Sequence, residues 1–179
     1  GAGCRVQYGA VPVPAGGQRA DLCVRGVGRA EFPRMQLAAD AKGIQLEVTL
    51  APSARHISGD ASRLQQVVWN LLSNAVKFTP AGGKVQVRLA CEDSQAHIEV
   101  SDTGQGINSE FLPFVFDRFR QQDSTSTRQH GGLGLGLAIA RHLVEIHGGT
   151  IAAASAGENL GSTFTVELPL AFTDEKRHC

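Results

Sequence analysis

The stretch from Asp60 to Lys77, DASRLQQVVWNLLSNAVK, decides the fold. Its apolar residues recur at the spacing i, i+3, i+4, i+7, which predicts one long amphipathic helix with a continuous buried face. Asp60 can cap the start of this helix, because an Asp carboxylate accepts hydrogen bonds from the free N–H groups of a first turn. A turn containing Pro and Gly at 79–83 ends the helix. The residues predicted to face the core are Leu64, Val67, Val68, Leu71, Leu72, Ala75 and Val76.

A polar stripe runs beside this apolar face. Gln66, Asn70, Asn74 and Lys77 are spaced so that they share one edge of the helix. Amide carbonyls are hard oxygen ligands that suit Mg²⁺, and a lysine can contact phosphate as a point charge. The stripe is a candidate site for a metal ion and a phosphate. The alternative is that Asn70 and Asn74 are ordinary solvent-exposed helix residues that bind nothing.

The rest of the chain predicts strands and helices around this helix. Five stretches have the apolar pattern of strands: 44–50, 84–91, 96–101, 150–155 and 162–168. Three more predict helices: a weak one at 31–42, a short one from 108, and one at 135–147. This layout predicts an α+β fold in two layers, a mixed sheet of about five strands covered on one face by about three helices.

The expected domain organisation has three parts. Residues 1–43 form a poorly defined N-terminal segment, a linker or a remnant of another domain. Residues 44–171 form one folded domain, and 172–179 form a tail. Within the first segment, 1–30 is rich in Gly, Ala and Pro and has no sustained period, so we expect it to be mostly disordered or poorly packed.

Composition excludes several classes of function. Seventeen basic and seventeen acidic residues cancel to zero net charge, which gives no reason to expect nucleic-acid binding. The four cysteines are far apart without a C-x-x-C pair, which argues against zinc and against a disulfide framework. No apolar run of membrane-spanning length and no secretion signal are present in the sequence, so we expect no membrane contact and a cytoplasmic location.

Two glycine-rich motifs carry the clearest chemistry. Asp102-Thr103-Gly104-Gln105-Gly106 follows an apolar strand, so its Asp can accept a hydrogen bond from an exocyclic amine such as that of adenine. A tight turn with an Asx cap is the alternative. Gly131 to Leu137, GGLGLGL, opens a helix, where free N–H groups and the positive dipole end favour an anion. A flexible hinge is the alternative there, and neither a P-loop nor a Rossmann fingerprint is present.

Each of two further motifs gives only a weak indication of function when it is taken alone. Phe114 to Phe119, FVFDRF, could anchor the polar loop that follows, or it could be a plain core cluster. In Gly161-Ser162-Thr163-Phe164, Thr163 could orient Asp102, or it could be an ordinary β-branched strand residue.

In this order and spacing, the five motifs resemble those of the GHKL (Bergerat-fold) ATPase superfamily, and within it the sensor histidine kinases. Residues 70–80, NLLSNAVKFTP, resemble the N box, 102–106 the G1 box, 114–119 the F box, 132–137 the G2 box and 161–164 the family's final glycine-containing motif. The resemblance extends over residues 46–170 and implies a two-layer sandwich of the Bergerat type.

The resemblance implies ATP and Mg²⁺ as cofactors. Asn70 and Asn74 would bind Mg²⁺, Asn70 and Lys77 would act in catalysis, and 120–132 would form a mobile lid over ATP. The residues implied to bind ATP are Asn70, Asn74, Lys77, Phe78, Asp102, Gly104, Gly106, Ile107, Phe119, Gly132, Leu133, Gly134, Leu135, Gly136, Leu137 and Thr163.

The family transfers the γ-phosphoryl group of ATP to a histidine on a dimerisation domain and then to an aspartate of a response regulator receiver domain. The implied partners are therefore those two domains. None of the six histidines here has the acidic and Pro neighbours of the family's acceptor. We therefore expect the chain to be a fragment that binds Mg²⁺–ATP without phosphorylating itself.

Two alternatives stay open. One is another GHKL protein, an anti-sigma serine kinase or an ATPase, although the helix has no acidic residue between Ala61 and Lys77 to activate water. The other is a non-catalytic module that binds ATP or a partner.

Overall fold

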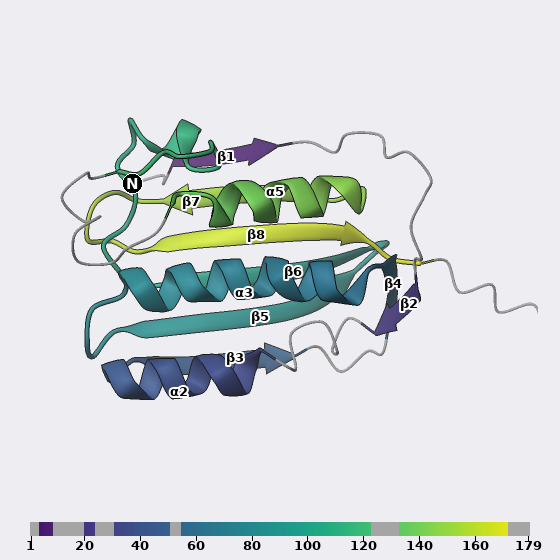
Figure 1. The fold of residues 1–179 in the computed structure, drawn as a ribbon, viewed down its shortest axis with the longest axis horizontal. Coiled ribbons are helices and arrows are strands. Elements are labelled where there is room, and N and C mark those ends of the chain that lie inside the picture. Colours follow the sequence, from purple (N-terminus) through teal and green to yellow (C-terminus); the bar gives the residue numbers. More distant parts are fainter. Residues whose placement is uncertain (1–3, 9–19, 24–30, 51–54, 123–132, 172–179) are drawn as a thin grey trace, which may run out of the picture.

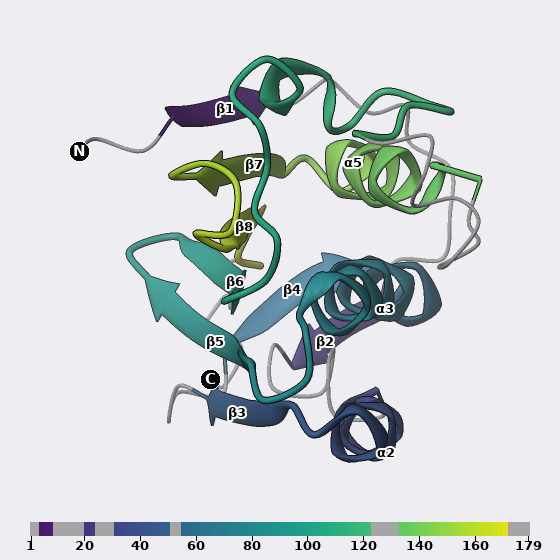
Figure 2. The same cartoon turned by 90° about the vertical axis from the view of Figure 1, so that its left-hand side faces the viewer.

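The computed structural model describes residues 4–8, 20–23, 31–50, 55–122 and 133–171. Within these residues, helices α2, α3 and α5 lie on one face of a six-stranded sheet (Figure 1). The view along the sheet separates the two layers (Figure 2). The predicted α+β two-layer fold is therefore confirmed.

The sheet has the order β1-β7-β8-β6-β5-β3. Only β3 and β5 are parallel, and the other neighbours are antiparallel. Its strands are β1 (Cys4–Tyr8), β3 (Gln45–Leu50), β5 (Lys84–Glu92), β6 (Gln95–Asp102), β7 (Thr150–Ser155) and β8 (Ser162–Pro169). A separate two-stranded sheet pairs β2 (Ala20–Cys23) with β4 (His56–Gly59). The sheet is mixed, as expected, and β8 lies in its interior although it is the last described strand.

Helix α3 (Ala61–Phe78) lies across the middle of the sheet (Figure 1). The carboxylate of Asp60 caps its start by accepting hydrogen bonds from the backbone N–H groups of Ser62 and Arg63. All seven residues that the period assigned to the core are buried in the structure. They stabilise the fold by about 1.5–3 kcal/mol for each large aliphatic side chain removed from water.

The other helices flank α3 on the same face. Helix α2 (Phe32–Lys42) ends at Gly43, whose left-handed φ of 68° suits glycine. Its Met35 and Ala39 are buried in the same core as α3. Helix α5 (Gly136–Ile146) buries Ala140, Leu143 and Val144. Among the described residues, no helix is long and apolar enough to cross a lipid bilayer.

The structure departs from the sequence expectations at three places. Strands β1 and β2 lie in residues 1–30, where little order is expected, because backbone pairing with β7 and β4 requires no apolar period. Strand β4 is absent from the expected elements because its four residues are too few to show an alternating apolar pattern. The helix expected from Asn108 is a single 3-10 turn, η1 (Leu112–Phe114).

Candidate functional site

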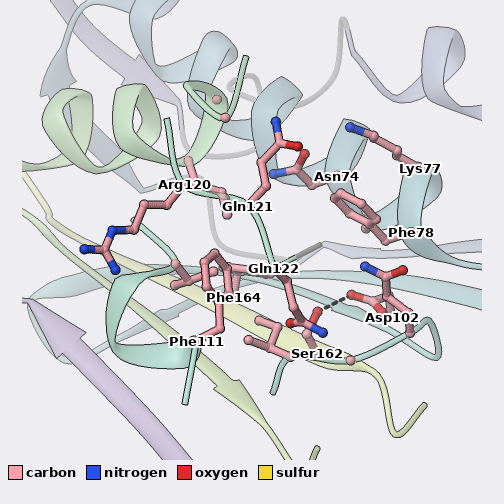
Figure 3. Close-up of a pocket in the computed structure, with 18 of the residues that line it drawn as sticks. Asn74, Lys77, Phe78, Asp102, Phe111, Arg120, Gln121, Gln122, Ser162 and Phe164 are labelled. Carbon is pink, nitrogen blue, oxygen red and sulfur yellow. Dashed lines mark hydrogen bonds between the residues drawn. The ribbon is translucent and has the colours of Figure 1, made fainter. Parts of the chain in front are cut away.

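A pocket with a volume of about 310 Å³ opens where α3 ends. Its walls come from the end of α3, the segment after β6, the segment before α5, and β8 (Figure 3). Eleven of the sixteen residues predicted to bind nucleotide line it: Asn74, Lys77, Phe78, Asp102, Gly106, Ile107, Leu133, Gly134, Leu135, Gly136 and Leu137. The fold thus brings three separate motifs, the end of the α3 stretch and the two glycine-rich motifs, to one cavity.

Asp102 is the only acidic residue that lines the pocket in the described part of the chain. Its Oδ1 accepts a hydrogen bond of 2.8 Å from the N–H of Gly104. Its Oδ2 accepts one of 2.5 Å from the hydroxyl of Ser162 (Figure 3). Burial raises the pKa of this carboxyl above its usual value, and the two hydrogen bonds oppose that rise. Because each carboxylate oxygen can accept more than one hydrogen bond, Asp102 can still accept one from a ligand.

The contact predicted for Thr163 is made by Ser162 instead. The antiparallel register places Ser162 directly opposite Asp102, whereas Thr163 pairs with Ser101. Neighbouring side chains on a strand point to opposite faces, so only one of the two can reach the carboxylate. Thr163 is not among the residues that line the pocket.

The loop after β6 comes very close to the loop after β7. Gly106 has a φ of +69°, and a Cβ at this position would overlap the carbonyl oxygen of Gly157. Glycine is needed here both for the left-handed φ and for the close approach of the two loops. Gly104 is buried and does not line the pocket, but its N–H fixes the rotamer of Asp102. The G1-like motif therefore shapes the wall from which Asp102 projects.

The last turns of α3 present the polar stripe to the pocket. Asn74 and Lys77 line it together with Phe78 (Figure 3). The Lys77 ammonium lies 4.8 Å from the centroid of the Phe78 ring, a cation–π arrangement. The last turns of α3 thus bring an amide, a cation and an aromatic ring to one edge of the cavity.

Asn70 lies near the pocket without lining it. Its amide nitrogen donates a 3.0 Å hydrogen bond to the carbonyl oxygen of Gly136, the first residue of α5. Asn70 therefore joins α3 to the start of α5.

The start of α5 is the part of the site that suits an anion. Leu135 is its N-cap residue and makes no side-chain capping hydrogen bond within the described chain. The first N–H groups of an α-helix have no partner inside the helix, and the dipole there is positive. Gly132 and the rest of the expected lid from residue 123 onward lie outside the described residues.

The aromatic motif divides into two parts. Phe116 is buried and packs edge-to-face on Phe164, with ring centroids 6.1 Å apart, behind the pocket wall. Phe119 is 71% exposed and does not line the pocket. Its N–H donates to the carbonyl of Gly134, so it contacts the site through its backbone.

Nine lining residues are not among the sixteen predicted to bind nucleotide: Ala75, Gln105, Phe111, Val115, Arg120, Gln121, Gln122, Ser162 and Phe164. Most come from the segment between Gln105 and Gln122, whose path the sequence does not indicate. Eight of the nine lie within the quoted motifs or the expected lid, which is the sequence signal that could have suggested them, and only Phe111 lies outside both. Within the described residues, no group of three or more His, Cys, Asp or Glu side chains could hold a metal ion.

The fold and the pocket together define a nucleotide-binding α+β domain. Residues 59–172 match the family model described as histidine kinase-, DNA gyrase B-, and HSP90-like ATPase. The hybrid signal transduction histidine kinase D of Dictyostelium discoideum is 43% identical over 140 residues, which cover 65% of this chain and 9% of that protein. This chain belongs to that ATPase family, and within it to the protein-histidine kinases.

Solved structures agree with this assignment. The mycobacterial sensor histidine kinase MprB is 31% identical with a TM-score of 0.74, and the match covers 85% of this chain and 97% of that one. Full-length ShkA in complex with AMPPNP is 30% identical with a TM-score of 0.74, and the match covers 90% of this chain and 32% of that one. The chain spans 9–21% of the first three curated relatives, so it corresponds to their ATP-binding domain.

Proposed function

We propose that this domain binds Mg²⁺–ATP in the pocket of Figure 3 and donates the γ-phosphoryl group to a histidine on a separate dimerisation domain. That histidine would pass the group to an aspartate of a response regulator. The observation that carries the proposal is that one cavity is lined by both a half-buried carboxylate, Asp102, and the start of α5, which no described side chain caps. A nucleotide offers an amine to the first and phosphates to the second.

Asp102 and its surroundings would hold the adenine. The carboxylate would accept the exocyclic amine, while Ser162 and Gly104 keep it in one orientation. Ile107 and Phe78 supply apolar surface beside it. Because Gly106 has no side chain, the ring could approach the backbone closely.

The phosphates would lie at the start of α5. The N–H groups of residues 134–137 suit anionic oxygens, and Leu133 lines the pocket beside them. Lys77 adds a positive charge. The amide oxygens of Asn70 and Asn74 are of the kind that Mg²⁺ accepts, and Mg²⁺ when bound would neutralise phosphate charge.

Phosphoryl transfer depends mainly on positioning and on charge neutralisation. The described lining residues supply a carboxylate, amides, cations and free N–H groups for these tasks. Asn70 and Lys77 would thereby assist the transfer without forming a covalent intermediate. The acceptor histidine would come from the dimerisation domain.

Two measurements test the proposal. Calorimetry with AMPPNP, with and without Mg²⁺, measures binding, and we expect a Mg²⁺-dependent affinity. Incubation with γ-labelled ATP and a related dimerisation domain should place acid-labile label on that domain. A His→Gln acceptor variant of that domain is the control.

The outcomes separate the alternatives. Tight AMPPNP binding without transfer to any tested dimerisation domain supports a non-catalytic module. Absence of AMPPNP binding contradicts the whole proposal. Acid-labile label on this chain alone contradicts the expectation that it does not phosphorylate itself.

A further inference from the structure

The C-terminal end of α3 has an unusual set of partners. The last four carbonyl groups of any α-helix lack N–H donor partners within the helix. Here the carbonyl of Ala75 accepts from the N–H and hydroxyl of Thr79, at 3.1 and 2.6 Å. The carbonyl of Phe78 accepts a 3.1 Å bond from the N–H of Gln105 in the loop that follows Asp102.

Lys42 completes this set from another element. Its ammonium donates to the two remaining carbonyls, at 2.9 Å to Val76 and 2.7 Å to Lys77. Lys42 is the last residue of α2, thirty-five positions before Lys77 in sequence. A cation at this end of the helix is also favoured by the helix dipole.

The segment after Lys42 holds the turn that follows α3. The carbonyl of Gly43 accepts from the N–H of Gly82, and the N–H of Gln45 donates to the carbonyl of Gly83, both at 2.9 Å. We call Lys42, Gly43 and Gln45 the Lys42 bracket. Partial burial lowers the pKa of Lys42, because desolvation disfavours the charged form. The two short bonds to Val76 and Lys77 nonetheless require a group at Lys42 that donates two hydrogen bonds, such as an ammonium.

The last turn of α3, which Lys42 caps, carries residues of the pocket. Lys77 and Phe78 line the cavity, and the carbonyl of Phe78 is bound to the loop that carries Asp102. If the last turn of α3 frays, these side chains lose their position together. The bracket therefore acts on the site from outside it, because Lys42 itself does not line the pocket.

We propose that Lys42 is a positioning residue for the nucleotide site: by capping Val76 and Lys77 it fixes the last turn of α3, and with it Lys77, Phe78 and the loop after Asp102. The effect on nucleotide affinity rests on the proposed function. The effect on the α3 turn does not.

Three variants of the full chain test the proposal. Lys42→Met keeps the aliphatic stem and removes both hydrogen bonds, so AMPPNP affinity should fall roughly three- to tenfold. Lys42→Arg restores a double donor and should recover most of the affinity. Arg34→Met removes a cation from an exposed position of the same helix and should leave affinity unchanged.

Hydrogen exchange in the nucleotide-free protein gives an independent measurement. In Lys42→Met, the amides of Thr79 and Gln105 should exchange faster, because their acceptors lie in the loosened turn. Amides at the start of α3 should keep their wild-type rates. A uniform change along α3 would indicate general destabilisation and would overturn the proposal.

The two proposals can fail separately. If the wild type binds AMPPNP and Lys42→Met binds within twofold of it, the positioning role is wrong. If the wild type does not bind AMPPNP, the proposed function is wrong, and the exchange measurement still decides whether Lys42 fixes the turn. Should Lys42→Met not fold, Lys42→Gln, which retains one donor group, takes its place with an intermediate effect expected.

Discussion

At the scale of single residues, Asp102 is where binding and stability oppose each other. Burial penalises its charge, while a ligand amine would favour that charge. We expect Asp102→Asn to weaken AMPPNP binding at least tenfold, because a lost charge-assisted hydrogen bond costs about 1.5–3 kcal/mol. Calorimetry measures this effect. The matched control is Asp93→Asn, in the exposed β5–β6 turn, where affinity should not change.

The same substitution should have the opposite effect on the nucleotide-free protein. Since the folded pKa of Asp102 is raised, the unfolded chain binds fewer protons, and stability falls as pH rises through that pKa. Asp102→Asn removes this loss. Its melting temperature relative to wild type should be highest near neutral pH, and the difference should shrink as pH falls through the raised pKa of Asp102 toward about 4, below which it should no longer change. A difference that does not vary with pH would contradict the burial argument.

Asn74 tests the metal assignment. It lines the pocket near the C-terminal end of α3 and is not part of the buried core. We expect Asn74→Ala to abolish the Mg²⁺-dependent part of AMPPNP binding and to leave the fold intact by circular dichroism. Gln66→Ala, in the same polar stripe but outside the pocket, is the control. Normal Mg²⁺-dependent binding by Asn74→Ala would refute the metal role.

The choice between Thr163 and Ser162 shows what a sequence lacks at this scale. Two adjacent strand residues project to opposite faces, and only the register with β6 decides which one meets Asp102. The sequence contains no signal for a register between strands sixty residues apart. Asp102, Asn74, Lys77 and Phe78 could be predicted because each belongs to a local motif.

At the scale of elements, α3 and α5 are joined by a hydrogen bond at each end of their contact. Asn70 donates to the carbonyl of Gly136 at one end. At the other end, the Nε2 atom of His147 accepts a 3.0 Å bond from the N–H of Asp60, and its Nδ1 lies 2.7 Å from the carbonyl oxygen of Leu143. The buried His147 ring therefore has its proton on Nδ1 and little freedom to move.

This fixed ring makes Gly59 intolerant of a side chain. A Cβ at Gly59 would lie 2.7 Å from Cδ2 of His147, and moving the ring would break its bond to Asp60. We expect Gly59→Ala to destabilise the wild type by about 1–3 kcal/mol. The same change should cost less in a His147→Ala background, where the clash is gone.

Urea denaturation of the four proteins measures this coupling. His142→Ala, at an exposed histidine of the same helix, is the control background and should leave the cost of Gly59→Ala unchanged. Equal costs in all backgrounds would show that the clash with His147 is not the cause.

Elements with a sustained period could be predicted, and short ones could not. Helix α3 and the β5–β6 hairpin repeat their apolar pattern several times, so both type and buried face follow from sequence. Strand β4 and the turn η1 are too short to repeat anything, and tertiary contacts fix them. The path of residues 105–122 around the pocket is set by such contacts too.

At the scale of the whole molecule, the amino-terminal limit of the folding unit can be tested. Helix α2 contributes Met35 and Ala39 to the core and Lys42 to the end of α3. We expect a chain starting at Glu31 to fold and bind AMPPNP, because β4 keeps its bridge from Ile57 to Leu170 without β2. A chain starting at Ile44 should lose about 2–5 kcal/mol of stability.

Urea denaturation and AMPPNP titration of both chains measure this difference. A chain from Glu31 that does not fold would show that β1 or β2 is required. Equal stability of the two chains would show that α2 is dispensable.

The position of β8 has a consequence for synthesis on the ribosome. It is the last described strand to be made, yet it lies between β7 and β6, and Ser162 brings the last contact to Asp102. Until β8 emerges, β6 and β7 cannot be joined into one sheet, and each has an unpaired edge open to aggregation. Nucleotide can therefore not rescue a chain that stops before residue 162. A nascent or prematurely terminated chain would depend on chaperones rather than on its own ligand.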